Sequence, residues 1–244
     1  MKREFARWYS HRLQKDMDIV TYGHYGTPLL MFPTAGADFL EYERFQLLDT
    51  IRPYIDSGKI KAFSINSINN ETWLRNWGSG RDKSLRHEAY FHYVVEEVVQ
   101  FIHNSCGGWQ PIITTGASLG ALHATNHFFR RPDLFRSLIA MSGSYDLHDY
   151  TKGYSDDLTY HNSPVLYMQN WHDAHWWNLH ANNNGIIIAS GQGDFEKPSA
   201  TAWISDVLNK RSIPHWADFW GYDQRHDWPT WRSMLPYFLG RIVG

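Results

Sequence analysis

Five short apolar runs, each ending in small or polar residues, constrain the fold of this chain more than any other feature. The segment 81–104, between the second and third runs, instead repeats apolar residues at helical spacing. Buried parallel strands joined by crossover helices give this alternation, so the chain is predicted to be α/β. The predicted strands are 27–34, 59–66, 111–116, 137–143 and 185–191.

Segments 4–10 and 16–23 are predicted to form an antiparallel hairpin that precedes the first parallel strand. No repeat, low-complexity tract or linker divides the sequence, which predicts one domain over 1–244. The irregular stretch 146–183 is long enough to be an excursion over the functional site. Further helices are predicted at 121–130, 199–210 and 228–241.

Charge and composition exclude several classes of partner. The net charge is −2 without a run of like charge, so neither nucleic acid nor a membrane surface is an expected partner.

The N-terminus lacks the apolar core of a secretion signal, which predicts a cytoplasmic protein. Cys106 is the only cysteine and cannot form an intrachain disulfide. Homo-oligomerisation is left open.

Ser118 stands between two glycines, in Gly116-Ala117-Ser118-Leu119-Gly120, where a predicted strand passes into a predicted helix. Such a turn holds a serine in a strained conformation and projects its hydroxyl above the sheet. The turn also aims the Leu119 amide at the oxyanion that forms when the hydroxyl attacks a carbonyl. A simple N-cap serine would need neither glycine, so Ser118 is predicted to be a nucleophile.

A serine nucleophile needs an imidazole base and an acid that orients this base. Of the 14 histidines, only His215 and His226 follow the strand 185–191. A final strand is predicted within 213–221; His215 lies inside it or at its start, whereas His226 lies in the loop beyond it. We therefore predict His226 as the base, with His215 structural, and Asp194 as the acid because it follows the strand 185–191. Asp146 is the second choice, followed by Asp218, Asp223 and Asp227.

Loops after the first two parallel strands are predicted to complete the site. Ala35 is expected to give the second oxyanion amide, with the Thr34 hydroxyl as a supplement. The tract 64–77 offers Asn69 and Trp73, among others, for substrate contacts. In the tryptophan-rich segment 170–180, pocket lining and stapling of a long loop are equally good interpretations, and the pocket candidates are Trp176 and Trp177.

Histidines at metal-binding spacing are interpreted as packing residues. His123 and His127 are four residues apart on a predicted helix but lack the adjacent glutamate of a zinc motif. The histidines of the segment 170–180 lie among tryptophans. No metal or other cofactor is predicted.

The chain resembles the esterase D-like family of the α/β-hydrolase superfamily, which includes S-formylglutathione hydrolases, feruloyl and acetylxylan esterases and mycolyltransferases. The resemblance runs through GASLGALHA, RPDLFRSLIAMSGSYD, IIIASGQGD and HDWPTWRSMLPYFL. It implies an α/β-hydrolase fold, with a mostly parallel sheet, an N-terminal antiparallel hairpin and helices on both faces. It also implies a triad of Ser118, Asp194 and His226. Many relatives carry a His-Gly pair where this chain has Phe32-Pro33-Thr34-Ala35.

The predicted function is cleavage of a small-molecule carboxylic ester through an acyl-enzyme on Ser118. An acyltransferase that uses the same acyl-enzyme is one alternative, and a binding protein without turnover on the same fold is another. Transfer of the acyl group to added alcohols would favour the first alternative. Any cleavage that depends on Ser118 would exclude the second.

Overall fold

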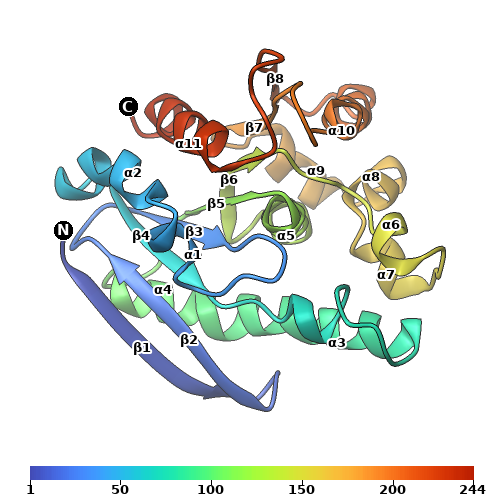
Figure 1. Cartoon of the computed structure of the whole chain (residues 1–244), viewed down its shortest axis with the longest axis horizontal. Coiled ribbons are helices and arrows are strands. Elements are labelled where there is room, and N and C mark those ends of the chain that lie inside the picture. Colours follow the sequence, from blue (N-terminus) through green and yellow to red (C-terminus); the bar gives the residue numbers. More distant parts are fainter.

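The computed structural model describes residues 1–244, and its strands form one eight-stranded sheet in the order β1-β2-β4-β3-β5-β6-β7-β8 (Figure 1). β1 (Arg3–Ser10) and β2 (Lys15–Tyr22) form the predicted antiparallel hairpin, and β2 pairs antiparallel with β4 (Ile60–Ile65). All other pairs are parallel. The remaining strands are β3 (Thr27–Phe32), β5 (Ile112–Ala117), β6 (Phe135–Met141), β7 (Ile186–Ser190) and β8 (Trp216–Phe219).

β3 lies between β4 and β5, so the winding direction of the chain reverses beside β3. Crossovers that diverge at such a point open a crevice at the carboxyl ends of the strands. The strands also end in register, since Phe32 pairs with Gly116 and Ala117 pairs with Met141. The loops that follow the parallel strands therefore meet along one edge of the sheet.

Helices cover both faces of this sheet (Figure 1). α1 (Glu41–Arg44), α2 (Leu47–Asp56) and α11 (Trp228–Ile242) contribute to the core on one face. On the other face, α3 (Gly80–His92) continues through the π-helical η2 (Tyr93–Val98) into α4 (Val99–Ser105). These three elements correspond to the single helix predicted over 81–104. α5 (Leu119–Arg130) and α10 (Pro198–Lys210) complete this layer.

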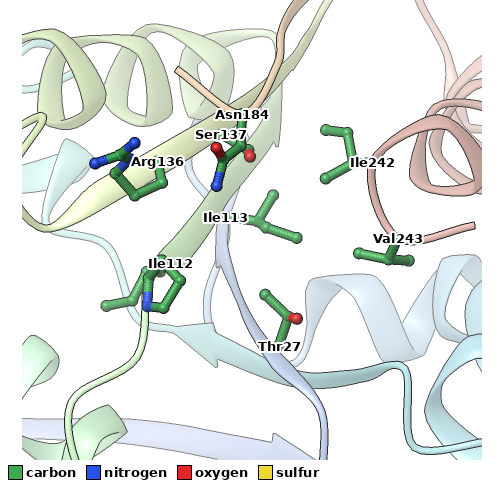
Figure 2. A pocket seen from close by; sticks show the side chains of 9 residues that line it. Thr27, Ile112, Ile113, Arg136, Ser137, Asn184, Ile242 and Val243 are labelled. Atoms are coloured by element: carbon green, nitrogen blue, oxygen red, sulfur yellow. The ribbon is translucent and has the colours of Figure 1, made fainter. Parts of the chain in front are cut away.

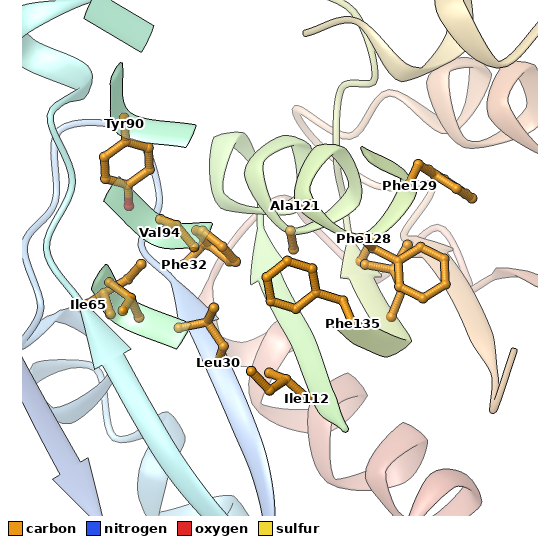
Figure 3. Packing of buried hydrophobic residues seen from close by; sticks show 14 of the residues in the cluster. Leu30, Phe32, Ile65, Tyr90, Val94, Ile112, Ala121, Phe128, Phe129 and Phe135 are labelled. Carbon is orange, nitrogen blue, oxygen red and sulfur yellow. The ribbon is translucent and has the colours of Figure 1, made fainter. Parts of the chain in front are cut away.

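The central strands contribute side chains alternately to two cores. Leu30 and Phe32 belong to one core, whereas Leu29 and Met31 belong to the other. Figure 3 shows the first core, where Phe32 and Phe135 lie near Ala121 of α5. Burial on both faces requires nearly continuous apolar strands, which explains why the runs could be recognised in the sequence.

The predicted excursion consists of short helices. They are α6 (His148–Thr151), α7 (Asp157–His161), α8 (Pro164–Tyr167), the 3₁₀ turn η3 (Met168–Asn170) and α9 (Ala174–Ala181). None of the helices of the protein combines the length and the apolar character that a membrane crossing requires. The cytoplasmic location stays a prediction from the sequence.

Candidate active site

Ser118 lies between β5 and α5 in the strained turn that the sequence predicts. Its backbone has φ of 56° and ψ of −124°, a left-handed conformation that residues other than glycine rarely adopt. A Cβ atom on Gly116 would lie 2.4 Å from the carbonyl carbon of Gly120. A Cβ atom on Gly120 would lie 2.3 Å from the carbonyl oxygen of Phe32. Both glycines are therefore required by the close approach of β3, β5 and α5.

Ser118 and His226 line the same cavity, which has a volume of about 270 Å³. His226 follows β8, and its ring packs edge-on against Trp231 of α11 with 5.1 Å between the ring centroids. Asp149 and Tyr150, from the predicted excursion, also line the cavity. The other lining residues are Ser142, Gly143, Ser144, Phe195 and Lys197.

Glu196, rather than Asp194, lies against the imidazole of His226. Its Oε2 atom is 3.4 Å from His226 Nδ1, and its side chain is 0% exposed. The Asp194 carboxylate is 63% exposed and pairs with Arg225 at 3.2 Å. Only the backbone carbonyl of Asp194 meets His226, accepting a hydrogen bond from its amide. The structure therefore places the side chain of Glu196, and not that of the predicted Asp194, beside the imidazole.

Local backbone conformation explains why Glu196, rather than Asp194, faces the imidazole. Phe195, between the two acidic residues, has φ of 63°, and its side chain is 89% exposed. Gly193 packs closely on the backbone of the loop 222–224. The chain thus turns sharply after β7, with Asp194 and Phe195 facing solvent and Glu196 facing the interior.

Two serine hydroxyls hold the Glu196 carboxylate, and an indole supports one of them. Ser142, which follows β6, donates to Oε1 at 2.6 Å, and Ser190 at the end of β7 donates to Oε2 at 3.2 Å. Trp231 Nε1 donates to the Ser142 hydroxyl at 3.0 Å. Burial raises the pKa of Glu196, but the hydrogen bonds from His226 and Ser142 outweigh burial and leave this pKa below its usual value. The carboxylate is therefore charged and oriented at neutral pH.

The other acidic candidates bond elsewhere. Asp146 accepts a hydrogen bond from the His148 amide, and Asp227 caps α11 by accepting from the Trp228 amide. Asp218 accepts from the Trp220 indole, and Asp223 accepts from Gln224. His215 bonds to Ser205 and to the Ile213 carbonyl, so both of its ring nitrogens are engaged, as a structural role requires.

The loop after β3 has two early amides without a partner in the protein, those of Ala35 and Gly36. Pro33 has no N–H, and the Thr34 N–H donates to Glu41 at 2.8 Å. The Thr34 hydroxyl also donates to Glu41, so its proton is not available for the predicted oxyanion contact. The Ala35 amide donates to no group of the protein. Leu119 is the first residue of α5, so its amide has no partner within the helix.

Asn69 and Trp73 are buried against side chains of α3 and α5 and do not line the cavity. The exposed fractions are 1% for Asn69 and 4% for Trp73. Asn69 Oδ1 is 2.8 Å from His123 Nε2, and Trp73 Nε1 donates to His87 at 3.0 Å. Trp73 belongs to a small apolar cluster that includes Leu119. Both predicted substrate contacts are thus corrected to supporting positions.

Trp176 and Trp177 belong to α9 and do not line the cavity of Ser118. The Trp177 indole donates to the Arg211 carbonyl at 3.2 Å and lines a separate surface pocket. Of the two interpretations of this segment, attachment of a long loop to α10 fits the contacts of Trp177. Pocket lining finds no support in the lining of this cavity, which includes neither tryptophan.

A second cavity lies at the opposite ends of the strands (Figure 2). It has a volume of about 130 Å³, and its lining includes Thr27 at the start of β3, Ile112 at the start of β5 and Arg136 in β6. It brings together no serine–histidine pair. No group of three or more histidine, cysteine or acidic side chains is placed to hold a metal ion.

Comparisons with known proteins identify the family and the fold. The model of the family described as "Putative esterase" matches residues 49–242. A ferulic acid esterase is similar in structure, with a TM-score of 0.77 and 18% identity over 99% of this chain and 97% of the other. An S-formylglutathione hydrolase from Agrobacterium tumefaciens also has a TM-score of 0.77, with 13% identity over 99% and 94% of the chains.

The fluorophosphonate-binding serine hydrolase F of Staphylococcus aureus has a TM-score of 0.72 and 12% identity, covering 100% of this chain and 98% of the other. No curated protein matches the sequence. Together, the solved structures confirm the predicted α/β-hydrolase fold.

Proposed function

Because the chain belongs to this esterase family and is a carboxylic ester hydrolase, we propose that it works through a triad of Ser118, His226 and Glu196. The observation that carries the proposal is the buried Glu196 carboxylate on the imidazole that shares a cavity with Ser118. Glu196 takes the place predicted for Asp194. A glutamate can fill this role because its carboxylate also fixes the tautomer and stabilises the imidazolium.

The proposed reaction begins when His226 takes the proton of Ser118 and the serine oxygen attacks the ester carbonyl. The Leu119 and Ala35 amides donate to the oxyanion of the tetrahedral intermediate. His226 then returns the proton to the leaving alcohol, which leaves an acyl-enzyme. A water molecule gives a proton to His226 and attacks the acyl group. His226 then returns the proton to the Ser118 oxygen as its bond to the acyl group breaks, which releases the acid and restores the enzyme.

The cavity supports a small substrate with polar groups. Its volume of about 270 Å³ lies slightly below the common range of small-molecule sites, about 300–1,000 Å³. Hydroxyl and charged side chains, including Ser142, Ser144 and Lys197, make up much of its lining. A short acyl ester such as p-nitrophenyl acetate is therefore the appropriate first assay substrate.

A fluorophosphonate reagent tests the nucleophile directly. We expect intact-mass analysis of the wild-type protein to show one adduct, and the Ser118→Ala variant to show none and to lose ester cleavage. Ser144→Ala removes another hydroxyl of the same cavity and serves as the labelling control, because it keeps the nucleophile. A wild-type protein without adduct, or an adduct that persists in Ser118→Ala, would contradict the proposal.

A further inference from the structure

A second buried carboxylate, Glu41, lies against the loop after β3 and takes no part in the proposed triad. Glu41 is the first residue of α1, and its exposed fraction is 4%. Its two oxygens accept both polar hydrogens of one residue, the backbone N–H and the hydroxyl of Thr34. No other residue of the protein donates to Glu41 through a side-chain hydrogen bond or an ion pair of its carboxylate.

Burying a carboxylate is costly unless its hydrogen bonds compensate. α1 has only four residues, and its capping needs no buried acid at this position. Burial raises the pKa of Glu41, although the two bonds from Thr34 oppose this effect. The side chain is thus kept at an energetic cost, and the only residue it holds is in the loop after β3.

Other contacts fix this loop on both sides of Ala35. The Tyr42 hydroxyl donates to the Phe32 carbonyl, and the Ser67 hydroxyl donates to the Ala37 carbonyl at 2.7 Å. The close contact of Gly120 with the Phe32 and Pro33 carbonyls seats the start of the loop on α5. Between these points, Glu41 fixes the peptide group that immediately precedes the free amide of Ala35.

We propose that Glu41 is a positioning residue that aims the Ala35 amide into the oxyanion hole by clamping Thr34. This inference rests on the proposed function, because it assigns a role within the same reaction. The Ala35 peptide plane shares its carbonyl with Thr34, so rotation of Thr34 would swing this N–H away from the oxyanion. Glu41 itself touches neither substrate nor reacting atoms.

Such a role should affect kcat rather than KM, because the oxyanion exists only after the serine has attacked. Removal of an oxyanion donor costs about 100- to 1,000-fold in kcat. Glu41→Gln keeps the side-chain volume but replaces one acceptor oxygen with an NH₂ group, which cannot accept from Thr34. We expect a partial misplacement of Ala35 and a decrease in kcat of about 10- to 100-fold.

The experiment compares kcat and KM for p-nitrophenyl acetate with the inhibition constant of a trifluoromethyl ketone. The ketone forms a hemiketal oxyanion with the serine, so its affinity reports the oxyanion hole directly. For Glu41→Gln we expect KM within about twofold of the wild-type value, and an inhibition constant that rises by the factor lost in kcat. A merely structural defect would lower the active fraction without changing this constant.

Glu43→Gln is the matched control, since Glu43 lies on the same helix but bonds to Tyr22 and Arg3. We expect wild-type kcat and inhibition from this control. If Glu41→Gln does not fold, Thr34→Val decides, because it removes only the hydroxyl half of the clamp. We expect a smaller decrease in kcat, with a matching rise in the inhibition constant.

The inference is overturned if a folded Glu41→Gln variant keeps the wild-type kcat or the wild-type inhibition constant. If only Thr34→Val folds, the same result for that variant overturns it. The wild-type measurements separate this failure from failure of the proposed function. A wild-type protein that neither cleaves the ester nor forms the fluorophosphonate adduct contradicts the triad itself. An active wild-type protein with indifferent Glu41 and Thr34 variants contradicts only the positioning role.

Discussion

Replacing Glu196 with glutamine should disable the enzyme while leaving its fold and substrate affinity intact. Glutamine has nearly the same shape, and its carbonyl oxygen can still accept from Ser142. It has no charge to stabilise the imidazolium of His226 in the transition state. Its NH₂ group can donate to His226 Nδ1, which in the native protein must itself carry a proton. The histidine would then hold its proton on the other nitrogen, Nε2, and this wrong tautomer could not accept the proton of Ser118.

The magnitude follows from the distance of 3.4 Å between His226 Nδ1 and Glu196 Oε2. At an effective dielectric constant of about 20, two unit charges at this distance attract by about 5 kcal/mol. The imidazole is 25% exposed, so solvent screens part of this attraction. We expect a loss of about 4 kcal/mol in transition-state stabilisation, which is about 1,000-fold in kcat.

The assay is steady-state hydrolysis of p-nitrophenyl acetate, with Tm and circular dichroism as measures of folding. KM should change little, because Glu196 lies behind the imidazole and does not line the cavity. Asp194→Asn is the matched control, with an expected kcat within about twofold of wild type because its exposed ion pair is weak. A kcat for Glu196→Gln within tenfold of wild type, or a 1,000-fold loss in Asp194→Asn, would refute the reasoning.

Two further predictions concern stability. Burial lowers the pKa of His123 and of His180 to about 4, so below pH ~6.5 the unfolded chain binds protons that the folded protein excludes. Each histidine should therefore lower the free energy of unfolding by about 3 kcal/mol between pH 6.5 and 4. Urea titrations at both pH values should show this loss in the wild-type protein and a smaller loss in His180→Phe. An equal pH dependence in the two proteins would contradict the prediction. Trp177→Ala should lower Tm and leave KM unchanged, because the indole bonds to the Arg211 carbonyl away from the cavity; a raised KM would show instead that this tryptophan contacts substrate.

Several elements could be predicted because their causes are local or periodic. The apolar runs predict the parallel strands, since a strand covered on both faces must be apolar throughout. The turn at Ser118 is recognisable because its glycines are required by close backbone approaches to Gly120 and Phe32. The position of His226 after β8 follows from chain order alone.

The carboxylate that meets His226 was harder to predict, because two carboxylates stand two residues apart after β7. The φ of 63° at Phe195 and the packing of Gly193 decide which of them faces the imidazole, and neither leaves a distinctive pattern in the sequence. Asn69 and Trp73 were predicted to contact substrate because they follow a strand on the side of the site. Instead they face inward, where each bonds to a buried histidine, and the sequence alone does not show which way such a loop turns.

The sequence by itself determined the α/β architecture, the strained serine and the histidine, because these depend on hydrophobic periodicity, on steric demands of glycine and on chain order. Only the tertiary structure decided which carboxylate meets His226, which amides after β3 are free and where Trp177 of α9 packs. These outcomes depend on how loops from different strands orient against one another. Orientation between distant segments is set by packing and burial in three dimensions, which the linear order of residues does not specify.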